Sequence, residues 1–266
     1  MKKSSSSKNA RKVALITGAG QGIGQRTAQL MATLGYNLVL NDLRMPEDTL
    51  SKVRASGAEA VHVLGDVSKE EVAAEMAQTA KSAFGSVDVL VNNAGISLIE
   101  RAENTSASAW RRVLDVNLLG PFLLCKTIGE IMLKQRRGAI VNVASIAGLC
   151  GVAERAAYNA SKHGIIGLTR TLAAEWGGYG VRSNAVCPGW VKTEMDAADQ
   201  ALGRYSDQDI TNRVPMGRFA SADDVARAIA FLADSEQSGF VNGHSLVVDG
   251  GWSVDASWES LRLSHR

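Results

Sequence analysis

The sequence has few cysteines, few histidines and few prolines, and each shortage excludes a class of protein. Its three cysteines, Cys125, Cys150 and Cys187, cannot all pair within one chain, and their wide spacing shows no zinc-ligand pattern. The four histidines are scattered and never stand four residues apart, so we expect no bound metal. The four prolines mark no linker. A reducing compartment, and with it a cytoplasmic location, is expected.

Long apolar runs are also missing. No stretch approaches the roughly 20 apolar residues of a membrane-spanning helix. The basic N-terminus is followed by only four apolar residues, 13–16, before Thr17 and Gly18, which is too short for the apolar region of a signal peptide. We therefore expect no membrane partner, and we expect residues 1–12 to form a disordered, solvated tail.

Basic charge is concentrated in that tail. The chain has 29 Lys and Arg against 27 Asp and Glu, a net charge of +2, and a pI near 8.4, which taken alone favours an anionic partner. Residues 1–12 contain five of the basic residues and no acidic one, so residues 13–266 carry 24 basic against 27 acidic side chains. Because the body of the protein is negative, we expect no nucleic-acid partner.

After the tail, short β-branched runs alternate with stretches of helical period. Continuous apolar strands separated by helices predict parallel strands covered on both faces, which is the doubly wound α/β class. We expect one domain over residues 13–252 and a C-terminal extension over 253–266. The expected strands lie at 13–16, 38–41, 60–64, 87–92, 139–143, 181–186 and 245–248, and the clearest helices at 23–34, 69–84, from 156 onward and at 222–233.

Residues 192–215 form the longest stretch without a clear pattern of helix or strand. A connection of this length in a compact domain is usually a lid or a binding loop. An irregular surface insertion is the alternative.

A glycine cluster connects the first strand to the first helix. Residues 17–24 read Thr-Gly-Ala-Gly-Gln-Gly-Ile-Gly. Glycines in such a turn let the backbone approach a pyrophosphate, and the N-terminus of the following helix presents free N–H groups and a positive dipole. Together with an acidic residue after the second strand, this context predicts a dinucleotide site.

That acidic residue is Asp42, and it favours NAD over NADP. A carboxylate at this position can accept hydrogen bonds from the ribose hydroxyls, whereas it would repel a 2′-phosphate. At ~4 Å and an effective dielectric of 20, one like-charge pair costs up to about 4 kcal/mol. Arg44 leaves NADP open, because a guanidinium two residues further on could reach a 2′-phosphate.

Tyr158 and Lys162 stand four residues apart in Tyr-Asn-Ala-Ser-Lys. On a helix they share one face, so the ammonium can lie close to the phenol. A nearby cation favours phenolate, so we expect the pKa of Tyr158 to be lowered from its reference of about 10. Such a tyrosine can exchange a proton with an alcohol while a hydride moves to or from nicotinamide.

The motifs taken together resemble those of the short-chain dehydrogenase/reductase family, in its single-domain form, from Lys12 to Trp252. The matching motifs are Thr17-Gly-x-x-x-Gly22-x-Gly24, Asn92-Asn-Ala-Gly95, Asn117, Ser145, Tyr158, Lys162, Pro188-Gly189 with Thr193, Pro215-Met-Gly-Arg218, Gly243 and Asp249-Gly-Gly251. This resemblance implies a Rossmann-type sheet of seven parallel strands in the order 3-2-1-4-5-6-7, with helices on both faces.

The resemblance also implies roles for matching residues. Tyr158 would be the general acid/base, Ser145 would donate a hydrogen bond to the substrate oxygen, and Lys162 would hold the nicotinamide ribose and tune Tyr158. Asn117 would position a water that links Lys162 to solvent. The cofactor contacts would be Gly18, Gln21, Gly22, Ile23, Gly24, Asp42, Asp66, Val67, Asn93, Ala94, Gly95, Tyr158, Lys162, Pro188, Gly189, Val191 and Thr193.

For the substrate, family geometry implies a pocket covered by residues 195–214 and lined by Ser97, Leu149, Cys150, Glu154 and Trp190. Its mixed polarity suits a small or medium polar ketone. The interpretation we favour is an NAD-dependent dehydrogenase of secondary alcohols, either polyols or sugar-like molecules. The main alternative, a 3-oxoacyl-[acyl-carrier-protein] reductase, typically uses NADPH with a basic residue in the glycine turn, where this chain has Gln21. A remote alternative is a non-catalytic dinucleotide-binding protein.

Other relatives fit less well. Epimerases and dehydratases of the family carry a larger C-terminal domain, and enoyl reductases have a wider gap between Tyr and Lys. The family is usually dimeric or tetrameric, through the long helices after the fourth and fifth strands and through the C-terminal helix and strand. We therefore expect a homotetramer or homodimer. The apolar residues of the extension 253–266 suggest that it packs on a neighbouring subunit, with a frayed terminus as the alternative.

Overall fold

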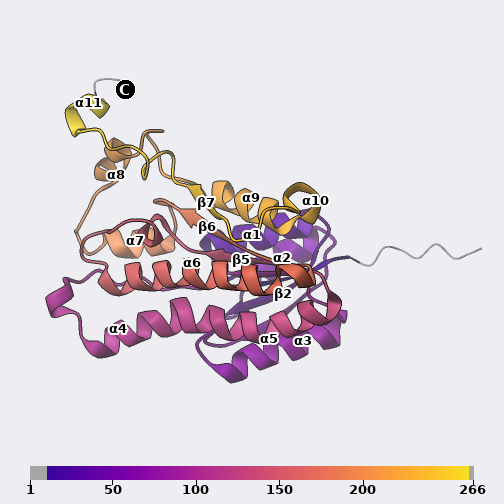
Figure 1. The fold of residues 1–266 in the computed structure, drawn as a ribbon. Coiled ribbons are helices and arrows are strands. Elements are labelled where there is room, and N and C mark those ends of the chain that lie inside the picture. The colour runs from indigo at the N-terminus through magenta and orange to yellow at the C-terminus, as the bar shows by residue number, and fades with distance from the viewer. Residues whose placement is uncertain (1–10, 264–266) are drawn as a thin grey trace, which may run out of the picture.

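Seven parallel strands form one twisted sheet in the order β3-β2-β1-β4-β5-β6-β7 (Figure 1). The computed structural model describes residues 11–263. The predicted tail at residues 1–12 therefore lies almost entirely outside the described residues, as do residues 264–266 of the extension. The strand order and the parallel pairing confirm the predicted fold class.

Every expected strand is present, and the observed ends differ from the expected ones by at most two residues. β1, β2, β4, β5 and β6 consist largely of buried residues because helices cover both faces of the sheet, whereas the edge strands β3 and β7 are more exposed. The strands are β1 Val13–Thr17, β2 Asn37–Asp42, β3 Ala60–Leu64, β4 Val89–Asn92, β5 Gly138–Val143, β6 Val181–Pro188 and β7 Ser245–Val248.

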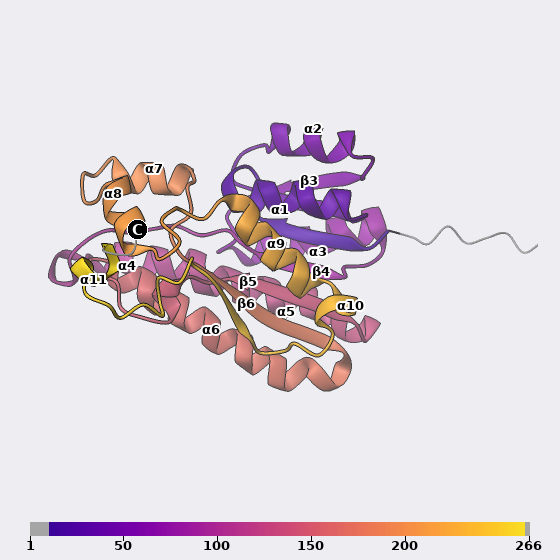
Figure 2. The same ribbon diagram turned by 90° about the horizontal axis from the view of Figure 1, so that it is seen from above.

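The helices form a layer on each side of the sheet (Figures 1 and 2). α1, α2 and α9 pack over one face, and α3, α5 and α6 pack over the other. Alternate residues of β1 serve the two cores, Ala14 and Ile16 on one side and Val13 and Leu15 on the other. The helices are α1 Gly22–Thr33, α2 Glu47–Ala55, α3 Glu70–Phe84, α4 Ala107–Leu114, α5 Gly120–Gln135, α6 Ala156–Trp176, α7 Glu194–Gln200, α8 Asp207–Arg213, α9 Ala222–Ala233, α10 Ser235–Ser238 and α11 Glu259–Leu263.

α4 and α5 form one long helix that is interrupted by a π-helical turn at Asp115–Leu119. By length and composition alone, Ala107–Gln135 could cross a membrane. Much of its apolar surface instead packs inside the protein, where Leu124 and Ile128 belong to the core beneath the sheet. The helix thus behaves as a core helix of this fold.

Residues 192–215 contain two short helices, which the sequence analysis did not predict. Thr193 caps α7 by accepting a hydrogen bond from the backbone N–H of Asp196. Ser206 and Asp209 form a reciprocal capping box at the start of α8. These caps satisfy backbone donors that short helices would otherwise leave unpaired. α7 and α8 lie at the end of the molecule opposite the start of β1 (Figure 2).

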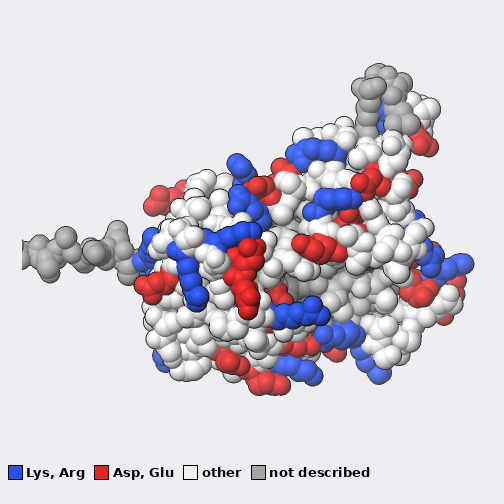
Figure 3. Space-filling view, turned by 180° about the vertical axis from the view of Figure 1, so that it is seen from behind, with Lys and Arg blue, Asp and Glu red and all other residues white. Residues whose placement is uncertain are grey.

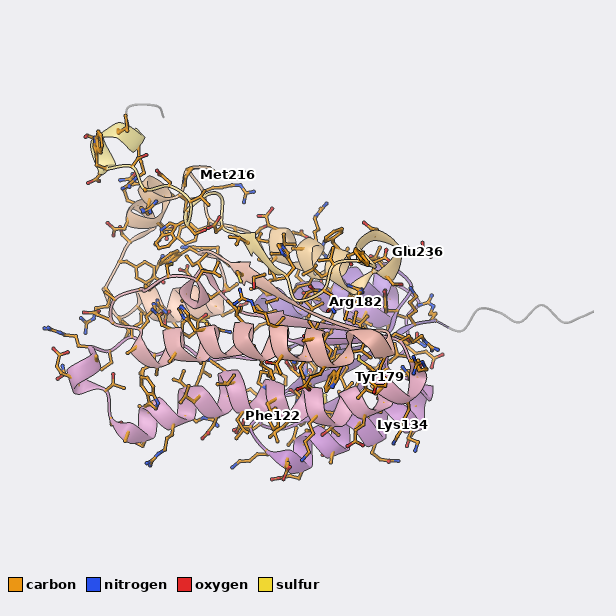
Figure 4. The ribbon with its side chains drawn as sticks, viewed as in Figure 1. Phe122, Lys134, Tyr179, Arg182, Met216 and Glu236 are labelled. Carbon is orange, nitrogen blue, oxygen red and sulfur yellow. The ribbon has the colours of Figure 1, made fainter. Side chains whose placement is uncertain are left out.

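The C-terminal extension packs against α8 of its own chain. Arg213 of α8 donates to the backbone oxygen of Asp255 at 2.8 Å, and its guanidinium lies 4.8 Å from the ring centre of Trp252. Met216, just after α8, is exposed (Figure 4). Packing on a neighbouring subunit stays a prediction.

Charges of both signs are interspersed on the molecular face seen in Figure 3. This face shows no extended field of one sign of the kind that attracts a polyanion. This mixture of charges agrees with the nearly balanced 24 basic and 27 acidic side chains of residues 13–266.

Candidate active site

The glycine turn lies at the carboxyl end of β1 and leads directly into α1. Gly22 has a φ of +55°, a left-handed conformation that favours glycine. A Cβ on Gly24 would overlap the carbonyl oxygen of Gly18, so the helix could not approach the strand as closely with any other residue. Gln21, at the N-cap of α1, makes no side-chain capping bond. The first N–H groups of α1 are therefore available to an anionic ligand.

Asp42 ends β2 beside this turn, and backbone groups hold its carboxylate in place. Its Oδ2 accepts from the N–H of Gly20 at 2.8 Å, and its Oδ1 accepts from the N–H of Leu43 at 2.7 Å and of Arg44 at 3.4 Å. The negative charge is thus fixed at one end of the cavity described below.

The end of β4 is tied to the same turn. Asn93 donates from Nδ2 to the carbonyl oxygens of Thr17 at 2.9 Å and Gly18 at 3.1 Å. The Thr17 hydroxyl accepts from the N–H groups of Asn93 and Ala94, both at 3.0 Å. These bonds explain why Thr17 and Asn93 belong to the motifs, since they hold two adjacent loops against each other.

Asn117 sits in the π-helical turn and is buried. Its Oδ1 accepts from the N–H of Ile96 at 2.8 Å, and its Nδ2 donates to the Ile96 carbonyl at 2.9 Å and to the Ser161 hydroxyl at 3.2 Å. The side chain therefore connects the loop after β4 to α6. Its amide is fully engaged in positioning these segments.

The predicted catalytic side chains come together where α6 packs beside the end of β5. Ser145 follows β5, and Tyr158 and Lys162 lie at the start of α6. The Nζ of Lys162 donates to the Val143 carbonyl at 2.8 Å and lies 5.4 Å from the centre of the Tyr158 ring. The Ser145 hydroxyl interacts with the Tyr158 phenol. The sequence separation of four residues on a helix thus brings phenol and ammonium together as predicted.

The electrostatics of this group differ from the expectation. Burial raises the pKa of the Tyr158 phenol above 10, while the hydrogen bond with Ser145 and the charge of Arg155 lower it in part. Burial also lowers the pKa of Lys162 to about 8. The expected lowering of the tyrosine pKa is not found, because removal of the phenol from water outweighs the combined effect of Ser145 and Arg155.

A cavity of about 590 Å³ runs from Asp42 past the glycine turn to Tyr158. All predicted cofactor contacts line it except Gly24, whose role is close packing of the helix. Its size lies within the range of small-molecule sites. Free N–H groups at the pyrophosphate position and a carboxylate at the ribose end fit a dinucleotide.

Only two of the five predicted substrate residues lie at the cavity or next to its wall. Trp190 lines the cavity, and Ser97 is hydrogen-bonded to two of the lining residues. Leu149, Cys150 and Glu154 do not line it. Leu149 and Cys150 follow the short 3₁₀ turn Ile146–Gly148, of which Ile146 and Ala147 line the cavity.

Sequence reasoning missed five charged residues that line the cavity, Arg112, Arg155, Glu194, Asp196 and Asp199. Two of them, Arg155 and Asp199, form an ion pair beside Tyr158. Arg155 immediately precedes α6 and stands three residues before Tyr158, and this short separation was the available signal. Asp199 had no signal, because it belongs to α7 within the stretch without a pattern. Tyr205 also lines the cavity and donates to Asp196 at 3.0 Å.

Comparison with known proteins agrees with this geometry. The family model described as enoyl-(acyl carrier protein) reductase matches residues 18–253. A D-threitol dehydrogenase from Mycolicibacterium smegmatis is 38% identical over 91% of this chain and 93% of its own length. A 3-oxoacyl-[acyl-carrier-protein] reductase from Synechocystis is 36% identical over 90% of this chain and 96% of its own.

Among solved structures, one from Beutenbergia cavernae superposes with a TM-score of 0.86 and is 39% identical over 93% of this chain and 98% of its own. It is described provisionally as an NAD(P)-dependent gluconate 5-dehydrogenase, with bound NADP. The chain belongs to the short-chain dehydrogenase/reductase family and is an oxidoreductase of that family.

Proposed function

We propose that the protein is an NAD(H)-dependent oxidoreductase that interconverts a secondary alcohol, either a polyol or a sugar-like molecule, and its ketone. The observation that carries this proposal is the single cavity that joins Asp42 and the glycine turn to Ser145, Tyr158 and Lys162. The D-threitol dehydrogenase among the relatives supports a polyol.

The chain's own residues divide the work of the reaction. Bound nicotinamide supplies the hydride acceptor or donor. Alcohol oxidation requires Tyr158 as the phenolate, after the phenol has given its own proton to water. The phenolate Oη then takes the hydroxyl proton, and the Ser145 hydroxyl donates a hydrogen bond to the substrate oxygen as charge develops there. Lys162 supplies a positive charge beside the phenol, and Asn117 holds the loop after β4 against α6. In carbonyl reduction the same proton moves in the opposite direction.

A 3-oxoacyl-[acyl-carrier-protein] reductase that uses NADPH remains the second candidate, because the Synechocystis relative has that activity in its name. Gln21 in the glycine turn and the fixed carboxylate of Asp42 favour the first candidate. For the assembly we propose a homotetramer or homodimer. A largely apolar groove lies beside α5, where Phe122 is seen in Figure 4, and it supports contact with a second copy. It is lined by Leu114, Asp115, Leu118, Leu119, Phe122 and Leu168.

The test is a panel of polyols, sugars, hydroxy acids and acyl thioesters, assayed with both cofactors, for the wild type and Tyr158→Phe. We expect turnover of alcohols or ketones with NAD(H). Loss of the phenol should lower turnover by about 10²–10⁴, the usual scale for one acid/base group. Unchanged turnover in the variant, or wild-type activity with acyl thioesters alone, would refute the proposal.

A further inference from the structure

Arg155 and Asp199 meet in the catalytic cavity, yet the proposed reaction gives neither a role. Arg155 immediately precedes α6, and Asp199 lies near the end of α7. The Nη2 of Arg155 is 2.9 Å from the Oδ2 of Asp199. The side chains are only 13% and 14% exposed, so this ion pair is held largely out of water. Water competes weakly with any ligand that reaches it.

Ser97, from the segment after β4, joins the pair. Its hydroxyl donates to the Oδ2 of Asp199 at 3.1 Å and accepts from the Nη1 of Arg155 at 2.7 Å. Three segments distant in sequence thus converge on one polar cluster. We call Ser97, Arg155 and Asp199 the polar cluster.

The polar cluster lies next to the reacting phenol. The guanidinium carbon of Arg155 is 5.9 Å from the centre of the Tyr158 ring. Arg155 lowers the pKa of Tyr158 and Asp199 raises it, so both charges act at short range on the group that exchanges the proton. A substrate whose alcohol oxygen contacts Tyr158 would have its neighbouring atoms close to this cluster.

The cluster has unused hydrogen-bonding capacity. Both of its internal bonds to Asp199 use Oδ2, and among residues 11–263 no donor is bound to Oδ1. A carboxylate oxygen at a cavity wall gains from a ligand that donates a hydrogen bond. The nearby guanidinium can donate to the oxygen of the same ligand.

The pair is neutral overall, and this neutrality decides which ligand group fits. A substrate carboxylate would meet Asp199 as a like charge, and an ammonium group would meet Arg155 in the same way. An uncharged hydroxyl avoids both conflicts, because it donates to Asp199 and accepts from Arg155. Hydroxyls are also the groups that a site built from buried polar atoms discriminates best.

We propose that the polar cluster is a hydroxyl-binding subsite, so that the enzyme prefers alcohols that carry a second hydroxyl close to the reacting carbon. This inference rests on the proposed function and names the residues that select its substrate class. Asp199 accepts a hydrogen bond from the second hydroxyl, and Arg155 donates a hydrogen bond to the oxygen of that hydroxyl. Ser97 is hydrogen-bonded to both side chains and keeps them in position.

A purely structural role for the ion pair would be to tether α7. The chain provides a control for this role, because the adjacent residue Glu154 pairs with Arg204 at 3.4 Å. This second pair connects the same two segments, and neither residue lines the cavity. Breaking it loosens the tether without touching the polar cluster.

The experiment compares matched alcohols that differ by one hydroxyl, 2,3-butanediol against 2-butanol and cyclohexane-1,2-diol against cyclohexanol. The ratio of kcat/KM for the diol to kcat/KM for the mono-ol is measured for the wild type, Asp199→Asn and the control Glu154→Gln. We expect the wild type to favour the diols. Asp199→Asn should lower the ratio about tenfold or more, because a hydrogen bond to a charged group is lost. Glu154→Gln should change both rates alike and keep the ratio within about twofold.

Three results would overturn the inference. One is a wild type that prefers the mono-ols, and another is an Asp199→Asn variant whose ratio changes no more than that of Glu154→Gln. The third is a wild-type preference for 3-hydroxybutyrate that Arg155→Ala abolishes, which would identify a carboxylate site instead. In each of these cases alcohol turnover would still support an oxidoreductase that interconverts secondary alcohols and ketones, whereas absence of turnover with every alcohol and ketone would refute the proposed reaction itself.

Discussion

Replacing Asp42 by Ala should shift the enzyme from NAD toward NADP. The carboxylate is held by the N–H groups of Gly20 and Leu43 at 2.8 and 2.7 Å, so it cannot turn away from a 2′-phosphate bound at that end of the cavity. Two like unit charges ~4 Å apart repel by about 4 kcal/mol at an effective dielectric of 20. Screening by solvent reduces this energy, and one third of it still corresponds to roughly a tenfold difference in affinity.

The assay is kcat/KM for NAD and for NADP at one ionic strength with one alcohol substrate. We expect the wild type to prefer NAD and the ratio of NADP to NAD to rise at least about tenfold in Asp42→Ala, with Arg44 then free to pair with the phosphate. Asp48→Ala is the matched control, because it removes the same charge from a side chain that is 60% exposed, paired with Lys52 and outside the cavity. The reasoning fails if the wild type prefers NADP or if both variants shift the ratio equally.

Three further predictions follow from local contacts. Burial lowers the pKa of Lys162 to about 8, whereas the pKa in the unfolded chain is about 10.4. Between these two pH values the unfolded chain binds more protons than the folded one, so the folded protein becomes more stable as pH rises. Below about pH 8 the buried charge costs about 3 kcal/mol of stability, and this cost disappears toward about pH 10.4. In urea unfolding, Lys162→Met should therefore be more stable than the wild type at pH 7, with a gap that narrows toward pH 10; a constant gap would contradict this. Glu194 lies close to the glycine turn, since a Cβ built on Gly22 would be 3.3 Å from the Glu194 carboxylate. Glu194→Gln should lower the Kd of NADH, measured by calorimetry, several-fold, because it removes a negative charge beside the position expected for the pyrophosphate. An unchanged or raised Kd would argue against that placement. Ser206→Ala breaks the capping box with Asp209 and should lower the free energy of local opening of α8 by about 1 kcal/mol. The change is measured as faster amide hydrogen exchange in α8, with the exchange rates of α9 as the internal reference.

Local patterns were sufficient for most of the fold. The strands are apolar runs of a few residues between helical stretches. Such runs are typical of parallel strands that helices cover on both faces, so the pattern predicts the sheet. The glycine turn and the spacing of Tyr158 and Lys162 are also local, since a strand-turn-helix unit and one helical turn determine both. The two helices within residues 192–215 were missed because each is short and depends on caps and tertiary contacts more than on a hydrophobic period.

The sequence by itself determined the class of the fold, the phosphate-binding turn and the acid/base group, because each of these depends on residues close together in the chain. Only the tertiary structure decided the environment of that group. It brought Ser97 and Asp199 to Arg155 across the cavity, from segments separated by up to about a hundred residues, and excluded Leu149, Cys150 and Glu154 from the wall. It also reversed the expected direction of the Tyr158 pKa, because burial is a property of the whole fold, whereas the position of a neighbouring lysine on a helix is not.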